Sequence, residues 1–128
     1  MRIKILITDD ELPIVESLSE ILEAAGYEVA TATSGQEAIG KVSDFCPQLL
    51  LSDVLMPNMN GFELALQIKK LCPECKLLLF SGQAATAKLA QNFIQTFNER
   101  GYRFELLPKP LHPDALLKRL EESLIRPA

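Results

Sequence analysis

The sequence predicts an α/β fold in which helices cover both faces of a five-stranded parallel sheet. Three short apolar runs are nearly unbroken, as strands buried on both faces of a parallel sheet are. Helical patterns alternate with these runs and with two further strand-like segments. Such alternation implies right-handed crossovers, which place helices on both faces. Because 48% of the residues are hydrophobic, the chain can fill one core, and we expect residues 1–128 to form a single domain.

The first two strand–helix units occupy the beginning of the chain. The apolar run "RIKILIT" (residues 2–8) predicts a buried strand. Apolar residues then recur at helical spacing over residues 13–25, with a proline suited to the first turn and a glycine suited to the end. The segment "YEVATA" (27–32) alternates, which favours a strand near a sheet edge, and "SGQEAIGKVSDF" (34–45) predicts the second helix.

Three more units complete the pattern. The apolar runs "QLLLSDV" (48–54) and "KLLLFSG" (76–82) predict central strands. Each is followed by a helical pattern, the first over residues 61–71 and the second over residues 85–100, which a glycine closes. The last strand is expected in the half-alternating segment 102–107. The last helix is expected over the segment "HPDALLKRLEESLI", with a proline in its first turn.

Charge and composition exclude several classes of function. A net charge of −4 and a pI near 5.0 argue against direct binding of nucleic acid or of an anionic membrane surface. Charged residues interrupt every apolar run, so neither a membrane span nor a signal peptide is predicted. Three cysteines without a framework spacing fit a reducing compartment. We therefore expect a cytoplasmic protein.

The segment "CPEC" places Cys72 and Cys75 at the spacing of half a zinc site or of a redox pair. A zinc site needs four ligands, yet the chain has no second cysteine pair and only one histidine, His112. The alternative interpretation is a loop between a helix and a strand.

Charged and hydroxyl side chains stand where four of the predicted strands end: Asp9, Asp10, Asp53, Ser81 and Lys109. In open parallel sheets the carboxyl ends of the strands meet at one edge, where ligands bind. Three aspartates about 5 Å apart at an effective dielectric near 20 would repel by roughly 3 kcal/mol per ionised pair, or about 10 kcal/mol in total. A dication or protonation must relieve this repulsion.

The residue types at this edge favour Mg²⁺ and a phosphoryl group. Carboxylates without histidine or cysteine select Mg²⁺ or Mn²⁺ over zinc. The hydroxyl of Ser81 and the ammonium group of Lys109 add a hydrogen-bond donor and a cation for phosphoryl oxygens. Taken singly, each residue also has a structural interpretation, because aspartate and serine start turns and cap helices and lysine is common on surfaces. Their joint occurrence favours a phosphoryl site.

The order of these motifs resembles the receiver domain of two-component response regulators over nearly the whole chain. The matching pieces are "DDE" after the first strand, "DVLMPNMNG" after the third, Ser81-Gly82 after the fourth and Lys109-Pro110 after the fifth. The resemblance implies a flavodoxin-like sheet with strand order 2-1-3-4-5. It further implies a signalling domain that is not an ordinary enzyme, because it assists only its own phosphorylation and dephosphorylation. In this family the Lys109-Pro110 peptide is often cis.

What the resemblance implies for the site is that Asp53 accepts a phosphoryl group from a histidine kinase, a phosphotransfer protein or a small phosphodonor. Asp10, Asp53 and the backbone carbonyl of Leu55 would hold Mg²⁺, with Asp9 acting through water. Lys109 and Ser81 would bind phosphoryl oxygens. The implied downstream partners are a protein or effector domain, and the resemblance allows a homodimer that forms on phosphorylation.

The sequence departs from the family in two places. The fourth helix is longer than usual by about a turn, and we expect its far end, residues 97–102, either to pack on the fifth strand or to form a partner surface. Leu106 stands where the family usually has a tyrosine or phenylalanine that turns inward on activation. Tyr102 or Phe104 would share its face in a regular strand and so provide a substitute ring.

Two other classes of function remain open. An aspartyl-phosphate phosphohydrolase uses the same Asp, Mg²⁺, Ser and Lys chemistry, but it usually has a second acid two residues after the nucleophile, where this chain has Leu55. The other class is a degenerate receiver domain that is not phosphorylated and serves only as an interaction module.

Overall fold

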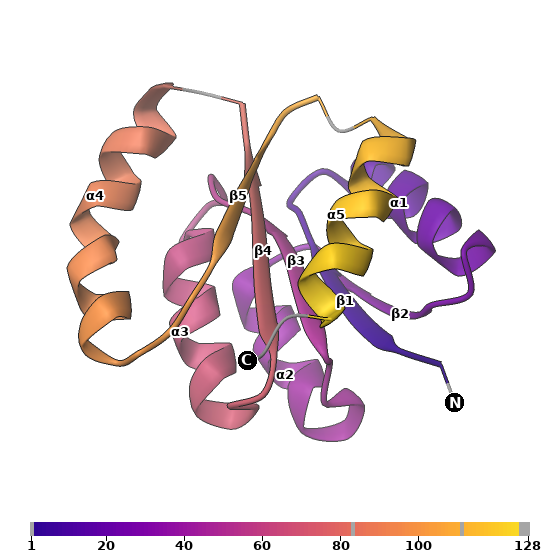
Figure 1. The fold of residues 1–128 in the computed structure, drawn as a ribbon, viewed down its shortest axis with the longest axis horizontal. Coiled ribbons are helices and arrows are strands. Elements are labelled where there is room, and N and C mark those ends of the chain that lie inside the picture. Colours follow the sequence, from indigo (N-terminus) through magenta and orange to yellow (C-terminus); the bar gives the residue numbers. More distant parts are fainter. Residues whose placement is uncertain (1, 83, 111, 126–128) are drawn as a thin grey trace.

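A computed structural model describes residues 2–82, 84–110 and 112–125, and within them five strands alternate with five helices (Figure 1). None of these helices is long and apolar enough to cross a membrane. In chain order the elements are β1 (Lys4–Thr8), α1 (Leu12–Ala24), β2 (Glu28–Ala32), α2 (Gly35–Phe45), β3 (Leu49–Asp53), α3 (Gly61–Leu71), β4 (Lys76–Ser81), α4 (Ala84–Glu99), β5 (Glu105–Pro108) and α5 (Pro113–Ile125).

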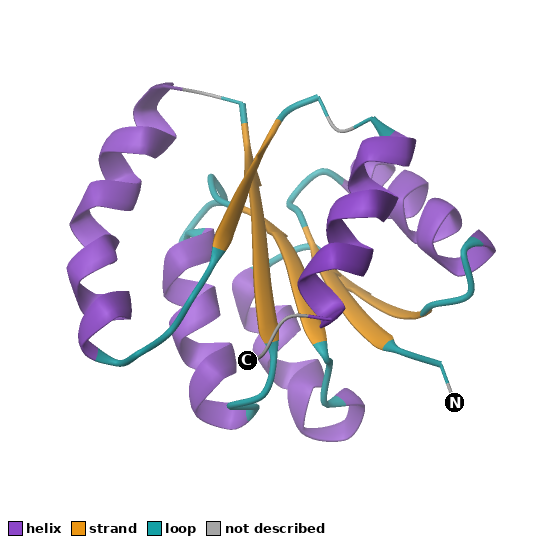
Figure 2. Ribbon diagram, viewed as in Figure 1, coloured by secondary structure: helices purple, strands orange, loops and turns teal. Residues whose placement is uncertain are grey.

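The strands form one parallel sheet in the order β2-β1-β3-β4-β5, which confirms the predicted fold (Figure 2). The three uninterrupted apolar runs are the three central strands, and the two alternating segments supply the edges. All five residues of β3 are buried, because helices cover both of its faces.

The helices divide between the two faces of the sheet. On one face, Leu22 of α1 and Leu120 of α5 pack with apolar residues of β1, β3 and β4. On the other face, Val42 of α2, Ile68 of α3 and Phe97 of α4 belong to a second core cluster. Figure 1 shows α4 at the β5 end of the sheet, beside α3. Every helix runs back toward the amino ends of the strands, so the loops that follow the strands gather at the opposite edge.

The predicted last strand needs a correction. It was expected at residues 102–107, whereas β5 spans Glu105–Pro108. Tyr102 and Phe104 precede the strand, and their rings pack against Phe97 with centroid distances of 6.3 Å and 4.9 Å. The aromatic cluster therefore holds this segment outside the ladder. Pro108 is compatible with the last position of β5 because the strand lies at an edge.

The far end of α4 packs into the core, where Phe97 contacts α3 and the segment that precedes β5, whereas the predicted packing was on the fifth strand itself. Phe97 is only 1% exposed and also packs edge-on against Phe62 of α3, 6.2 Å between centroids. Tyr102 and Phe104, the rings expected to share the face of Leu106, are both engaged in this cluster. Leu106 itself is 40% exposed.

Candidate functional site

Three carboxylates meet at the carboxyl edge of the sheet. Asp9 follows β1 directly and Asp53 ends β3, and the two strands pair with Thr8 opposite Ser52. The equal register therefore places these two aspartates side by side. Among the described residues, one carboxylate oxygen from each of Asp9, Asp10 and Asp53 lies within 4.8 Å of the others. At that separation and an effective dielectric near 20, each ionised pair costs about 3 kcal/mol, as the sequence led us to expect.

Lys109, which directly follows β5 at the same edge of the sheet, supplies a cation to this cluster. Its Nζ lies 3.2 Å from Oδ2 of Asp53, to which it donates a hydrogen bond, and 4.0 Å from Oδ2 of Asp9. The backbone N–H of Lys109 donates to the carbonyl oxygen of Ser81 at 2.9 Å, which extends the pairing of β5 with β4. The Lys109–Pro110 peptide is cis. Lys109 is thus positioned by the end of the sheet.

Two glycines permit close approaches around the site. A Cβ at Gly61 would lie 2.5 Å from the backbone oxygen of Asp53, so any larger residue would push apart the loop that follows β3. A Cβ at Gly82 would lie 3.0 Å from Cβ of Lys109. Asn60 begins α3 with a reciprocal capping box to Glu63, which fixes the other end of the same loop.

The site opens into a pocket of about 270 Å³. Five of the six predicted site residues line it together with three others: Asp10, Asp53, Leu55, Ser81 and Lys109 with Glu11, Gly82 and Thr86. The sixth, Asp9, is fully buried and lies beneath the opening.

Sequence reasoning missed Thr86. This residue lies in the first turn of α4, is 2% exposed, and its Oγ1 has no hydrogen-bond partner among the described residues. A threonine inside a helical pattern does not stand out by its spacing. Its position shortly after Ser81 was the only feature of the sequence that could have indicated its place at the site. The CPEC segment, by contrast, lies far from this pocket, because Cys72 directly follows α3 and Cys75 directly precedes β4.

The environment of Asp9 disfavours its ionised form. Burial raises the pKa of Asp9 to about 6 from 3.8, and the nearby charge of Asp53 acts in the same direction. The hydrogen bond that the N–H of Glu11 donates to Oδ1 of Asp9, 2.9 Å long, and the Lys109 ammonium only partly offset this. Oδ2 of Asp9 is buried without a hydrogen-bond partner among the described residues. At neutral pH, which is above this pKa, Asp9 is mostly ionised and its negative charge is only partly offset by these neighbours.

The carboxylates fit a hard divalent cation. They offer oxygen ligands only, and Mg²⁺ coordinates oxygen at about 2.0–2.1 Å, so oxygens on opposite sides of one ion lie about 4 Å apart. The carboxylate oxygens of Asp9, Asp10 and Asp53 lie within 4.8 Å of one another, which is close to that oxygen–oxygen distance. Three carboxylates and the single Lys109 ammonium leave two negative charges, which one dication would neutralise.

In protein kept free of divalent cations, the free energy of unfolding should fall as the pH rises from about 4 to about 6. The reason is that in this range the folded state binds the Asp9 proton more tightly than the unfolded state does. Asp9→Asn should remove this loss. The variant should therefore be more stable than wild type at pH 7 by up to about 3 kcal/mol, with little difference at pH 4. Urea denaturation in the presence of EDTA, from pH 4 to pH 7, measures the unfolding free energies of wild type and of the variant.

Asp44→Asn provides the control, since Asp44 is an exposed carboxylate near the end of α2. If the difference in unfolding free energy between Asp9→Asn and wild type stayed constant from pH 4 to pH 7, the Asp9 assignment would be wrong.

Comparison with known proteins agrees with this geometry. Residues 5–121 match the family described as the response regulator receiver domain. The chain is 30% identical to the chemotaxis protein CheY of Thermotoga maritima over 120 residues, which cover 93% of this chain and 95% of that protein. It is 32% identical over 126 residues to the Bacillus subtilis alkaline phosphatase synthesis transcriptional regulatory protein PhoP.

The match to PhoP covers 98% of this chain and half of that longer protein. Among solved structures, a CheY-like response regulator receiver domain protein from Methanospirillum hungatei superposes with a TM-score of 0.82 at 31% identity. That alignment covers 97% of this chain and 94% of the other. The family match extends over all five strands and most of the last helix. The chain therefore belongs to the response regulator receiver domain family.

Proposed function

We propose that this chain is a phosphoacceptor switch in which Asp53 receives a phosphoryl group in a Mg²⁺-dependent reaction. The observation that carries the proposal is the position of the Lys109 ammonium, 3.2 Å from Oδ2 of Asp53, at a pocket shared with further carboxylates. Family membership supports it. The proposed donor is a phosphohistidine of a histidine kinase or phosphotransfer protein, or a small phosphodonor.

In the proposed reaction a carboxylate oxygen of Asp53 forms a bond to phosphorus while the bond between phosphorus and the donor's imidazole nitrogen breaks. The Lys109 ammonium and the Ser81 hydroxyl bind phosphoryl oxygens, both from residues that line the pocket. This cation and this donor act where negative charge accumulates in the transition state.

Asp10, Asp53 and the backbone carbonyl of Leu55 would hold Mg²⁺, with Asp9 acting through water. When bound, the ion supplies positive charge beside the carboxylates and the incoming phosphoryl oxygens. Two features of the structure support this assignment: Asp10, Asp53 and Leu55 line the pocket, and Asp9 is buried with an oxygen that lacks a hydrogen-bond partner among the described residues.

The same geometry weighs against the two alternatives. A phosphohydrolase would need an acid two residues after Asp53, and Leu55 has an apolar side chain there, 40% exposed at the pocket. A degenerate interaction module would not need the carboxylates and the lysine gathered in one pocket.

We further propose that residues 1–128 constitute one receiver domain that acts in the cytoplasm, where three free cysteines are compatible with the reducing environment. Its proposed output is binding of a downstream protein or effector domain, or dimerisation of the phosphorylated chain, without direct contact with nucleic acid. The homologue PhoP is a transcriptional regulatory protein, which supports an effector domain as one such partner.

Incubation with acetyl phosphate and Mg²⁺ tests the proposal. Intact-mass spectrometry should show one added phosphoryl group, and the adduct should not form in EDTA. Continuous release of phosphate from the donor, without a lasting adduct, would indicate a phosphohydrolase. No adduct and no release, with folded protein and Mg²⁺ present, would indicate an interaction module.

A further inference from the structure

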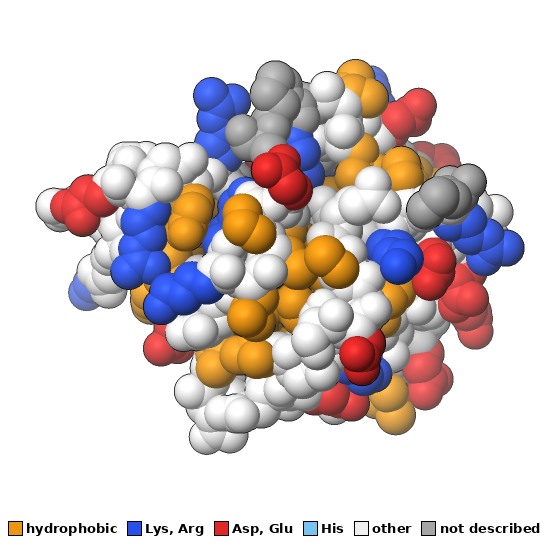
Figure 3. Space-filling model, turned by 90° about the horizontal axis from the view of Figure 1, so that it is seen from below, with side chains coloured by type: hydrophobic (Ala, Val, Ile, Leu, Met, Phe, Trp, Pro, Cys, Tyr) orange, Lys and Arg blue, Asp and Glu red, His pale blue; other side chains and the backbone are white. Residues whose placement is uncertain are grey.

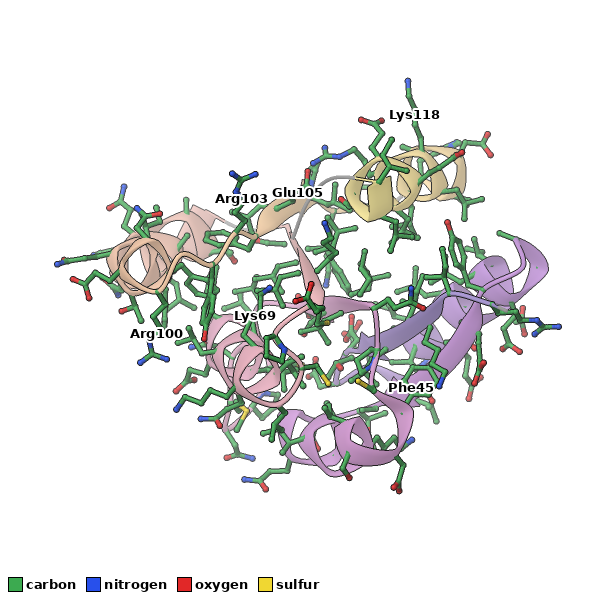
Figure 4. The ribbon with its side chains drawn as sticks, turned by 60° about the horizontal axis from the view of Figure 1, so that its bottom comes forward. Phe45, Lys69, Arg100, Arg103, Glu105 and Lys118 are labelled. Atoms are coloured by element: carbon green, nitrogen blue, oxygen red, sulfur yellow. The ribbon has the colours of Figure 1, made fainter. Side chains whose placement is uncertain are left out.

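Two cysteines from different helices meet at the edge of the sheet opposite the acidic pocket. Cys46 follows the last residue of α2 and Cys72 follows the last residue of α3, and their Sγ atoms lie 3.2 Å apart. Figure 4 labels Phe45 at the end of α2 and Lys69 in α3, which shows how these two helix ends lie together. The sulfurs belong to residues 26 positions apart in the sequence.

The structure pairs Cys72 with Cys46 rather than with its sequence neighbour Cys75. Cys75 is fully buried in the core, and its Sγ lies 3.4 Å from the backbone oxygen of Lys76, to which the thiol donates. The CPEC spacing indicates a pair formed by Cys72 and Cys75, whereas the contact observed between two thiols joins Cys72 to Cys46. The pair that can react is made by the packing of α2 beside α3.

The two thiols differ in their access to solvent. Cys46 is exposed, whereas Cys72 is 6% exposed. Figure 3 views the molecule from below and shows hydrophobic side chains gathered near the middle of that face. A small oxidant can thus reach the Cys46 thiol directly. The Sγ atom of Cys72, 3.2 Å away, is then in position to react with the oxidised Cys46.

We propose that Cys46 and Cys72 form an intramolecular disulfide when the protein meets hydrogen peroxide. The Cys46 thiolate attacks one peroxide oxygen, the O–O bond breaks, and the departing hydroxide takes a proton to become water. The sulfur of Cys72 then displaces hydroxide from the Cys46 sulfenic acid and loses its proton, which yields the disulfide and a second water. Two thiols lose two electrons and two protons, and one peroxide is reduced to two waters.

The surroundings of the two cysteines favour a disulfide that forms slowly and resists reduction. Burial raises the pKa of the Cys72 thiol to about 11, and the adjacent Cys46 contributes in the same direction. Cys72 also stands at the carboxyl end of α3, where the helix dipole disfavours a thiolate. Because the reduced form gains little from ionising, it is not stabilised against oxidation, and the disulfide should resist reduction. Closure requires the sulfurs to approach by about 1 Å, to a bond length near 2.05 Å.

Peroxide treatment of the purified, reduced chain tests the proposal. Free thiols are then alkylated without reduction, and a glutamate-specific protease is used because cleavage after Glu74 separates Cys72 from Cys75. Mass spectrometry should show the peptide with Cys46 joined to the peptide with Cys72, with the loss of two hydrogens. The melting temperature should rise by about 10 °C and return on treatment with dithiothreitol.

Matched variants separate the three cysteines. Cys75→Ser should form the same link and show the same rise in melting temperature, while Cys46→Ser and Cys72→Ser should show neither. Three results would each overturn the proposal: a link through Cys75, a Cys46 sulfinic or sulfonic acid beside a Cys72 that is still a free thiol, or a dimer joined through Cys46 of two chains.

Discussion

Asp53→Asn is expected to reduce phosphoryl uptake from acetyl phosphate to background while the chain stays folded. Asparagine has nearly the size of aspartate, and its amide oxygen can still accept a hydrogen bond from Lys109 Nζ, now 3.2 Å from the carboxylate. The amide lacks the negative charge that makes a carboxylate oxygen a nucleophile. Intact-mass spectrometry measures the uptake, and circular dichroism checks the fold.

The folded state should lose nothing in this variant, because one of three mutually repelling carboxylates disappears. Asp44→Asn makes the same chemical change near the end of α2, far from the pocket, and should be phosphorylated like wild type. Undiminished labelling of Asp53→Asn would show that another residue is the acceptor.

Asp10→Asn is expected to weaken Mg²⁺ binding by at least about tenfold and to slow phosphorylation at limiting Mg²⁺ to a similar extent. Changes in residues that only support metal ligands commonly cost this much affinity, and Asp10 is proposed to bind the ion itself. Its carboxylate lines the pocket and reaches within 4.8 Å of the carboxylates of Asp9 and Asp53. The chain has no tryptophan, so amide shifts in NMR spectra are the appropriate measure of the titration.

Glu11→Gln is the matched control, because it also removes one negative charge from the rim of the pocket and leaves the three aspartates intact. Its Mg²⁺ affinity should change much less. Equal losses in Asp10→Asn and Glu11→Gln would mean that the pocket attracts the ion only by its overall charge, without direct coordination by Asp10.

Much of the fold could be predicted because the apolar runs and the helical periodicity are local. The three unbroken runs became β1, β3 and β4, and the helices agree with their predicted limits to within about a residue. Periodicity does not order strands in a sheet, and the order of this sheet was expected from the family motifs alone. The limits of β5 were missed because Tyr102 and Phe104 pack on Phe97, a contact between separate segments.

Five of the six site residues could be predicted as a set because they stand at strand ends, where a parallel sheet must bring them together, while Leu55 was implied only by the family resemblance. The pocket is lined by five of the six, with Asp9 buried below. Thr86 escaped prediction because its place in the pocket depends on how the first turn of α4 returns over the sheet edge.

The sequence by itself determined the α/β class, the carboxyl edge as the site, and the residue types that suit Mg²⁺ and a phosphoryl group, since all of these follow from local patterns and their order. The family resemblance implied different roles for Asp9 and Asp10, but only the tertiary structure showed that these identical neighbours differ in burial. The N–H of Asp9 donates to the carbonyl oxygen of Ala32, the last residue of β2, and this extension of the sheet keeps Asp9 fully buried while Asp10 is exposed. Likewise, only the packing of α2 beside α3 brought Cys46 to Cys72, because distances between segments are set by the core and not by spacing along the chain.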